Sequence, residues 1–205
     1  VETLLDGVDD DPAIQPVLLG GISEELARLE RLVGALQGVD QRLLQPLQLH
    51  LSPLALGRVI QGSVGNFEAI AARLGITLSV ILPTALPLIT ADEDRLIQVL
   101  TNLLDNALKF TPRGGQVRVE AGEAATALWV RVCDTGVGIA PDERPHLFQQ
   151  FYRGADSRPP EKRGMGLGLT LCREIITAHG GEIQVTSTVG QGACFTFTLP
   201  KPVSG

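Results

Sequence analysis

The sequence predicts an α/β fold, a two-layer sandwich with a mostly antiparallel sheet, preceded by a fragment of a helical hairpin. Residues 92–112 have the three- and four-residue leucine spacing of a long amphipathic helix. Later segments with the two-residue period of strands come in pairs, at 116–121 with 127–133 and at 182–186 with 193–199. Paired strands beside one long helix favour a sheet that is covered by helices on one face. A heptad pattern near the start of the chain predicts the hairpin.

The composition is that of a folded protein and excludes several classes. Of the 205 residues, 44% are hydrophobic and 20% are charged, so we expect a globular chain. Aromatic residues make up only 4%, so Leu, Val, Ile and Ala must form the core. A net charge of −6 without a dense Lys/Arg patch argues against nonspecific nucleic-acid binding. The sequence has no secretory signal peptide and no apolar run of about 18 residues that would span a membrane.

The three cysteines, Cys133, Cys172 and Cys194, lie far apart and have no paired spacing. We therefore expect neither a metal site nor a disulfide framework, but buried thiols in a reducing compartment. The chain opens without Met, inside a helical pattern, so we expect it to be a fragment of a longer protein.

Residues 1–45 are expected to form a helical hairpin. Residues 1–5 have the pattern of a helix end, and 22–43 carry Ile22, Leu29, Leu36 and Leu43 seven residues apart. A hairpin with such a stripe cannot bury it alone, so we expect it to dimerise into a four-helix bundle. A hairpin that packs on its own second domain is the alternative.

The second domain is expected over residues 46–205, with Pro46 as the helix breaker. In order, the patterns predict a strand, a helix weakened by three glycines, a strand, a loop, the central helix, two strands joined by a turn at Gly122, a helix through His179 and two final strands. The ranges before the central helix are 47–51, 54–74, 76–82 and 83–87.

The central helix carries two stripes. Its start has two candidate caps, a capping box of Thr90 with Glu93 or an N-cap at Asp92. Beside the leucine stripe, a polar stripe shares one side of the helix at Gln98, Asn102, Asn106 and Lys109. Amide oxygens suit Mg²⁺ and a Lys suits phosphate. An ordinary solvated face is the alternative interpretation.

The strand at 127–133 leads directly into Asp134, with Gly136 and Gly138 just behind it. A carboxylate at a strand end can accept a hydrogen bond from an amino group such as that of adenine. The glycines allow backbone to approach a flat ligand closely. A glycine-rich turn without a ligand is the alternative.

Two further segments could contact an anionic ligand. In LFQQFYR, residues 147–153, we expect two Phe to anchor a short helix, and 154–163 has the composition of a mobile lid beside Arg153. A solvated loop with chance charges is the alternative. Gly164, Gly166 and Gly168 then open the next helix, whose free N–H groups could bind phosphate. The pattern is neither a dinucleotide fingerprint nor a P-loop.

In this order, the segments NLLDNALKF, DTGVGI, LFQQFYR and GMGLGL resemble the nucleotide-binding boxes of the sensor histidine kinases. Those kinases belong to the ATPase family shared with DNA gyrase B, the heat-shock chaperones and the MutL mismatch-repair proteins. The resemblance covers residues 47–200 and implies the Bergerat ATP-binding fold, with ATP and Mg²⁺ as cofactors. The hairpin resembles the dimerisation and phosphotransfer domain of these kinases.

The resemblance also implies roles for individual residues. Asn106 would coordinate Mg²⁺ with support from Asn102, and Asp134 would bind the adenine amine. Lys109 and Arg153 would contact phosphate and, with Asn106, position ATP. Ala193 departs from the family, which often has Ser or Thr there. The remaining residues implied in nucleotide binding are Phe110, Gly136, Gly138, Ile139, Gly164, Met165, Gly166, Leu167, Gly168 and Leu169.

None of the three histidines fits the phosphoacceptor of this family, which is followed by an acidic residue and then Thr/Ser-Pro. His50, His146 and His179 are better interpreted as structural. We therefore expect the phosphoacceptor before Val1, and no autophosphorylation by this chain alone.

The sequence thus predicts the ATP-binding catalytic region of a two-component sensor histidine kinase. Implied partners are a response-regulator receiver domain and a second copy of the chain, and the implied location is cytoplasmic, with membrane anchoring of the full protein left open. Two alternatives remain: a nucleotide-gated dimerisation module without kinase activity, and an ATP-hydrolysing relative of gyrase that uses Asp105 on the central helix.

Overall fold

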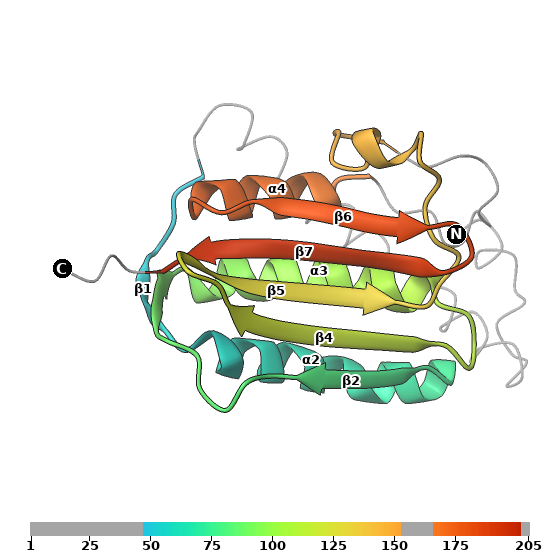
Figure 1. Cartoon of the computed structure of the whole chain (residues 1–205), viewed down its shortest axis with the longest axis horizontal. Helices are drawn as coiled ribbons and strands as arrows, with labels where there is room; N and C mark the ends of the chain where they lie inside the picture. The colour runs from blue at the N-terminus through green and yellow to red at the C-terminus, as the bar shows by residue number, and fades with distance from the viewer. Residues whose placement is uncertain (1–46, 153–165, 202–205) are drawn as a thin grey trace, which may run out of the picture. The chain divides into compact units, whose positions relative to one another are not determined.

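The computed structural model describes residues 47–152 and 166–201, and these residues form one layer of strands and one of helices (Figure 1). The hairpin expected at 1–45 and its dimerisation lie outside the described residues, so both stay predictions.

A five-stranded sheet forms the first layer, in the order β2-β4-β5-β7-β6. Only the β2–β4 pair is parallel; the other three neighbouring pairs are antiparallel, which confirms the mostly antiparallel sheet. The strands are β2 (Thr77–Ile81), β4 (Gln116–Glu123), β5 (Ala127–Asp134), β6 (Ile183–Thr188) and β7 (Gly192–Pro200).

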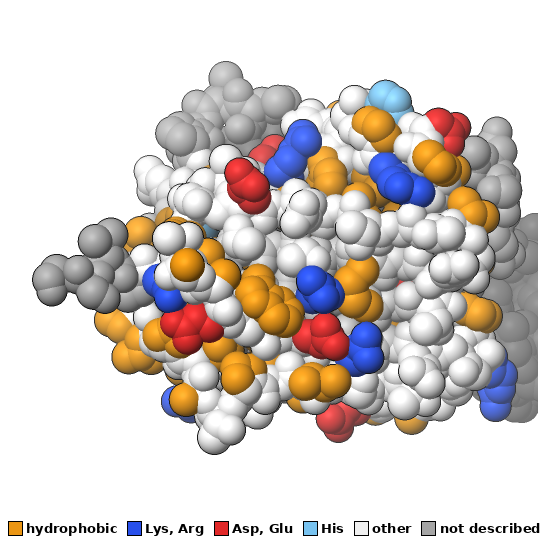
Figure 2. All heavy atoms as spheres, viewed as in Figure 1, with side chains coloured by type: hydrophobic (Ala, Val, Ile, Leu, Met, Phe, Trp, Pro, Cys, Tyr) orange, Lys and Arg blue, Asp and Glu red, His pale blue; other side chains and the backbone are white. Residues whose placement is uncertain are grey.

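Three helices cover one face of this sheet: α2 (Leu56–Leu74), α3 (Glu93–Phe110) and α4 (Gly168–Ala178) (Figure 1). Strand periodicity explains the two faces. Val117 and Val119 of β4 are buried, while Arg118 between them is exposed. The other face, called the open face here, carries charged, polar and apolar side chains interspersed without a dense basic patch (Figure 2). The two-layer sandwich predicted from the sequence is confirmed.

Helix α3 lies at the centre of the helical layer. Its leucine stripe is fully buried, with Leu96, Leu100 and Leu104 at 0% exposure. Of the two candidate caps, Asp92 is the N-cap, because its Oδ1 accepts a hydrogen bond from the Arg95 backbone N–H at 3.1 Å. Thr90 instead lies in a short strand, β3 (Ile89–Ala91).

Helix α2 runs for 19 residues through the three glycines that were expected to weaken it. Its buried face, which includes Leu56, Val59 and Ile60, holds it on the core. The helix ends at Gly75, whose φ of 68° is left-handed and lets its N–H close the last turn.

Three local predictions were wrong. Residues 47–51 form no strand; β1 (Ser52–Leu54) begins after them and pairs with β3, and the leucine alternation leaves Leu51 exposed. The turn between β4 and β5 lies at 124–126 instead of Gly122, which sits inside β4 under the Trp129 indole. At 147–151 there are turns instead of a helix; the 3₁₀ helix η2 (Arg144–His146) precedes them, and of the two Phe only Phe148 is buried.

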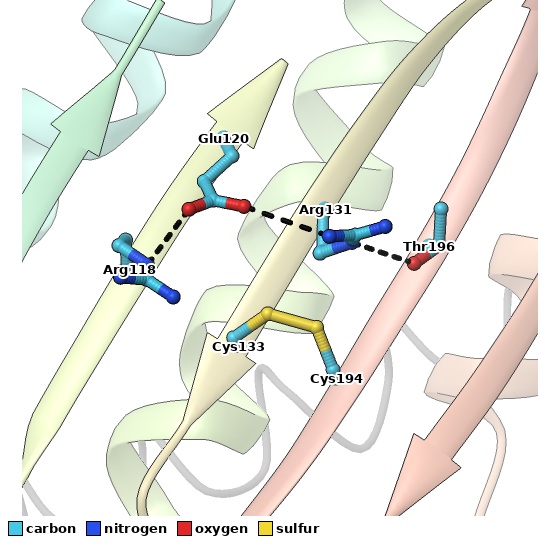
Figure 3. A network of polar contacts seen from close by, with 6 residues as sticks. All are labelled: Arg118, Glu120, Arg131, Cys133, Cys194 and Thr196. Carbon is cyan, nitrogen blue, oxygen red and sulfur yellow. Dashed lines mark hydrogen bonds and ion pairs between the residues drawn. A yellow bond between two sulfur atoms is a disulfide. The ribbon is translucent and has the colours of Figure 1, made fainter. Parts of the chain in front are cut away.

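The prediction that no disulfide forms was also wrong. Cys133 of β5 and Cys194 of β7 are directly opposite in the register and form a disulfide on the open face (Figure 3). Their sequence separation of 61 hides a neighbourhood that only strand pairing creates. Cys172 is a buried free thiol, as expected.

Among residues 47–152 and 166–201, every helix is too short or too polar to cross a bilayer.

Candidate functional site

Three segments that are distant in the sequence meet at one end of the sheet: the end of α3, the loop after β5 and the start of α4. The Val137 N–H donates to the Phe110 carbonyl oxygen at 3.4 Å, which joins the loop to α3. A Cβ built on Gly168 would stand 3.4 Å from Asn102 Oδ1, so the start of α4 also faces α3. The structure therefore brings together the polar stripe, the Asp134 loop and the described part of the second glycine segment.

Asp134 is the ionisable group at the centre of this region. Its Oδ1 accepts hydrogen bonds from the Gly136 N–H at 2.8 Å and from the Ala193 N–H at 3.3 Å. Desolvation by burial raises the pKa of Asp134, although the two N–H groups act in the opposite direction. Because Oδ1 is held by backbone, we expect Oδ2 to be the oxygen that meets a ligand.

The glycines of the loop are needed for close approach. A Cβ on Gly136 would collide with the Phe110 carbonyl oxygen and lie 2.7 Å from Asp134 Oδ1. Gly138 has a φ of 70°, and a Cβ there would strike the Thr188 carbonyl oxygen. Both positions are therefore closed to other residues, which supports a shaped pocket wall over a simple flexible turn.

The hairpin between β6 and β7 also supports this loop. This support was not predicted from the sequence. The Ser187 hydroxyl accepts from the Ile139 N–H at 2.9 Å and donates to the Gly192 carbonyl oxygen at 2.6 Å. Ala193, where we expected a lost side-chain contact, contributes its backbone N–H to Asp134. Gly190 and Gly192, both with positive φ, were the available signal for such a close approach.

On α3, Asn102, Asn106 and Lys109 are half-buried and follow one side of the helix. The buried Cys172 thiol of α4 donates to the Val99 carbonyl oxygen at 3.8 Å. Burial raises the pKa of that thiol to about 12, although the Asn102 side chain lies close enough to act in the opposite direction, so the thiol stays protonated at neutral pH. Gln98 accepts a hydrogen bond from Arg95 instead, so it belongs to the start of the helix.

The end of α3 carries Lys109 and Phe110, which were predicted to lie beside the bound nucleotide. The Lys109 ammonium lies 5.6 Å from the centroid of the Phe110 ring. Phe110 is half-buried, and its carbonyl oxygen accepts from the Asp134 loop. Phe110 thus joins the end of the polar stripe to the Asp134 loop.

The N-cap residue of α4, Leu167, provides no side-chain cap to the first turn of the helix. Gly166 has a φ of 73°, and a Cβ on it would stand 2.6 Å from the Tyr152 carbonyl oxygen. The Phe151 N–H donates to the Gly166 carbonyl oxygen at 3.1 Å. Leu169 is half-buried against the core.

Three of the predicted site residues, Arg153, Gly164 and Met165, fall in the range 153–165 that the structure does not describe. The same holds for the lid expected at 154–163. Their roles remain predictions.

The histidines inside the described ranges make structural contacts. His179 ends α4, with Nδ1 2.8 Å from the Ile175 carbonyl oxygen, and its Nε2 accepts from the Asp92 N–H at 3.0 Å. The His50 N–H donates to Asp92 Oδ2 at 2.8 Å. His146 lies beside the ring of Tyr152.

A cavity of about 400 Å³ opens on the other side of the same strand ends. Cys133, Cys194, Arg118 and Thr186 of the open face line it, together with Asp134 and residues of the β6–β7 hairpin. Its lining includes no residue of α3 or α4, so it approaches Asp134 from the side of the sheet opposite those helices.

The donor groups decide which ligand fits. In the described part of the chain, no three His, Cys, Asp or Glu side chains gather to hold a metal ion. Amide oxygens of α3 next to an uncapped helix start suit Mg²⁺ that arrives on a nucleotide, because Mg²⁺ is commonly shared between few protein ligands and phosphates.

Comparisons with known proteins identify the family of the chain. Residues 91–203 match the family described as histidine kinase-, DNA gyrase B-, and HSP90-like ATPase. The chain is 38% identical over 173 residues to the adaptive-response sensory kinase SasA of Rippkaea orientalis, covering 84% of this chain and 44% of that protein. It is 33% identical over 201 residues to the sensor protein SrrB of Staphylococcus aureus, covering 98% of this chain and 34% of the relative. The chain thus spans less than half the length of these relatives.

Solved structures show the same fold. Full-length ShkA in complex with AMPPNP superposes with a TM-score of 0.80 at 30% identity, over 91% of this chain and 38% of that one. The histidine kinase ThkA in complex with the response regulator TrrA superposes with a TM-score of 0.73 at 26% identity, over 94% of this chain and 53% of that one.

Proposed function

Because the chain belongs to the histidine kinase-, DNA gyrase B- and HSP90-like ATPase family, we propose that it carries the ATP-binding catalytic domain of a two-component sensor histidine kinase. The domain binds Mg²⁺-ATP and passes the γ-phosphoryl group to a histidine of the full protein. None of the three histidines of this sequence carries the phosphoacceptor motif, so we propose that the acceptor lies elsewhere in the full protein.

One observation carries the proposal: Asp134, with a half-buried carboxylate held by two backbone N–H groups, stands where α3 and the glycine-shaped loop meet. We assign it the adenine amine, which donates to Oδ2. Gly136, Gly138 and Ile139 form the wall beside the base, and Phe110 lies at its edge.

The phosphates then extend along α3 toward the start of α4. Lys109 supplies a positive charge, and the uncapped N–H groups after Leu167 offer donors to anionic oxygens. Gly166 and Gly168 keep this path free of side chains. The proposal also includes roles at the nucleotide for Arg153, Gly164 and Met165, which rest on the sequence alone.

Asn106 would hold Mg²⁺, and Asn102, which faces the start of α4, would support it. The ion would neutralise phosphate charge during transfer. The contribution of the protein is positioning: it binds the base, orients the phosphates and offers the terminal phosphoryl group to an incoming imidazole.

The proposed partners follow from the same family. The ThkA–TrrA complex supports a response-regulator receiver domain, whose Asp would receive the phosphoryl group. Homodimerisation through residues 1–45 and a cytoplasmic location of the domain are parts of the proposal that rest on the sequence resemblance.

Calorimetric titration of Mg²⁺-ATP into the chain and into Asp134→Asn tests the proposal. We expect binding by the unchanged chain and at least tenfold weaker binding by the variant, about 1.4 kcal/mol for one lost charge-assisted hydrogen bond. Asp94→Asn is the matched control, since Asp94 is exposed in the first turn of α3, and should bind normally. Equal affinity of Asp134→Asn and the unchanged chain would remove Asp134 from the site, and no binding by either would overturn the proposal.

A measurement of ATP hydrolysis distinguishes the gyrase-like alternative from the proposed kinase function. Asp105 is exposed and lies off the polar stripe, which does not favour it as a base for water. We expect negligible ATP hydrolysis; turnover that Asp105→Asn abolishes would favour an ATPase instead.

A further inference from the structure

The disulfide lies in a continuous row of side chains on the open face. Strand register places Arg118, Cys133, Cys194 and Thr186 opposite one another across β4, β5, β7 and β6. The Cα atoms of the two cysteines are 4.0 Å apart. The pair therefore results from directly opposite positions on neighbouring strands of one sheet.

The two sulfur atoms are accessible to small molecules. Both cysteines are half-buried and line the cavity of about 400 Å³, which is open to solvent on one side. Cys172 differs, because it is fully buried in the core and its thiol stays protonated. Of the three cysteines in the sequence, Cys133 and Cys194 are thus the two that a reagent in water can reach.

The surrounding charges favour thiol chemistry at this pair. Arg118 is the cross-strand neighbour of Cys133, and Arg131 lies two residues before it on the same face (Figure 3). Glu120 holds both guanidinium groups, at 2.9 Å from Arg118 Nε and 3.7 Å from Arg131 Nη1. Arg118, directly opposite Cys133, is the positive charge that can stabilise a thiolate, the reactive form of cysteine, while Glu120 and Asp134 are the negative charges nearby.

We propose that Cys133 and Cys194 form a site of reversible thiol–disulfide exchange with low-molecular-weight disulfides and dithiols, and that its redox state sets the affinity of the neighbouring nucleotide site. In the oxidising direction, one protein thiolate attacks a small disulfide, RSSR, forms a mixed disulfide and releases one RS⁻. The second protein thiolate then attacks the protein sulfur of that mixed disulfide and releases the second RS⁻. The protein loses two protons and two electrons, and RSSR gains them as two thiols.

The coupling follows from the backbone on either side of the bond. Cys133 directly precedes Asp134, and Cys194 directly follows Ala193, whose N–H donates to Asp134 Oδ1 at 3.3 Å. The disulfide therefore ties the two strands together one residue away from the contact that orients this carboxylate. A pre-organised carboxylate binds with a smaller ordering cost, so the oxidised chain should bind nucleotide more tightly. This second half of the inference rests on the proposed ATP site, whereas the exchange itself does not.

Opening the bond leaves the core intact. The buried side chains of β5 and β7, such as Val132 and Phe195, point to the opposite face of the sheet from the two cysteines. The two redox states can therefore share one fold, which a reversible site requires.

Thiol counting on the whole chain tests the exchange. Alkylation with iodoacetamide in denaturant should label one cysteine before treatment, because two of the three are bonded, and three after dithiothreitol. After removal of dithiothreitol, oxidised glutathione should return the count to one within the folded protein. A count that stays at three, or glutathione adducts that persist on the chain, would overturn the exchange site.

Titration of Mg²⁺-ATP into oxidised and reduced chain tests the coupling. We expect roughly threefold or greater weakening on reduction. The double variant Cys133→Ala/Cys194→Ala should bind with the reduced affinity in both buffers, which excludes effects of the reductant elsewhere. Equal affinities of the oxidised and reduced chain would overturn the coupling. Absence of nucleotide binding in every sample would instead overturn the proposed function, and the thiol count would still decide the exchange.

Discussion

Two aspartates show how local partners set the behaviour of single residues. Burial raises the pKa of Asp134, which keeps two backbone hydrogen bonds. Burial alone would also raise the pKa of Asp92, but hydrogen bonds from the His50 and Arg95 N–H groups and the charge of Arg95 outweigh it and lower the net pKa. We propose a ligand-binding role for the first carboxylate, whereas the contacts of the second stabilise the start of α3.

Opposite pH dependences of stability follow from these shifts. The charged form of Asp134 is disfavoured by folding, so wild type loses stability as pH rises from about 3.9 through the raised folded pKa. Asp134→Asn cannot ionise and should gain stability relative to wild type over that window. For Asp92, stability is present above about 3.9 and is lost as pH falls through the lowered folded pKa. Asp92→Asn should therefore lose stability relative to wild type as pH rises through that range.

Urea unfolding of wild type and both variants between about pH 2.5 and 7 measures these differences. If the stability difference from wild type changed with pH in the same direction for both variants, the opposite pKa shifts of Asp134 and Asp92 would be contradicted.

At the scale of elements, α3 depends on its first turn. Asp92 caps the helix and also accepts from the His50 N–H, so Asp92→Ala removes both bonds. We expect the free energy of unfolding to fall by about 2 kcal/mol, somewhat above the usual cost of a lost N-cap. Asp94→Ala, two residues further on and exposed, should change it by less than about 0.5 kcal/mol. An equal loss in both variants would show that the cap has no special role.

In helix α2, substitutions are expected to stabilise the protein instead. Around Gly62 and Gly65 nothing lies within 4 Å of a Cβ, so alanine fits at both positions. Each Gly→Ala change should raise the free energy of unfolding by about 0.5–1 kcal/mol, because alanine loses less backbone entropy in a helix. Gly136→Ala, where a Cβ would collide with backbone, should instead destabilise. Chemical denaturation of the three variants gives the comparison, and destabilisation by Gly65→Ala would contradict it.

At the scale of the whole molecule, the site joins three segments that are distant in the sequence. A ligand that bridges α3, the Asp134 loop and the start of α4 should therefore stabilise the whole domain. At a Mg²⁺-ATP concentration of about 100 times Kd, linkage predicts about 2.7 kcal/mol of added stability. Thermal unfolding with and without Mg²⁺-ATP should show a raised Tm, and Gly136→Ala should lack this rise. An unchanged Tm at saturating nucleotide would argue against the site.

The disulfide also contributes at this scale, because it joins positions 61 residues apart. Loop closure of that length restricts the unfolded chain, so reduction should lower the free energy of unfolding by about 2–4 kcal/mol. Denaturation with and without dithiothreitol measures this, and Cys133→Ala/Cys194→Ala should not respond to the reagent.

Local periodicity was sufficient to predict the fold class, because α3, β4 and β5 each bury one face, and that requirement is written into consecutive residues. The same reasoning failed at 47–51 and at Gly122. Alternating leucines predict a strand only when a partner strand is present, and a glycine predicts a turn only when no neighbour needs its space. Both conditions depend on residues far away in the chain.

The sequence by itself determined the two-layer fold, the order of its elements and the chemistry available in the polar stripe and the glycine segments. Only the tertiary structure decided that the Ala193 N–H and the Ser187 hydroxyl support the Asp134 loop, that Asp92 caps α3, and that Cys133 and Cys194 are bonded. The physical reason is the distance along the chain over which each effect acts. Side-chain period and backbone preference act over a few residues, whereas a contact across β5 and β7 exists only after the sheet has brought both strands together.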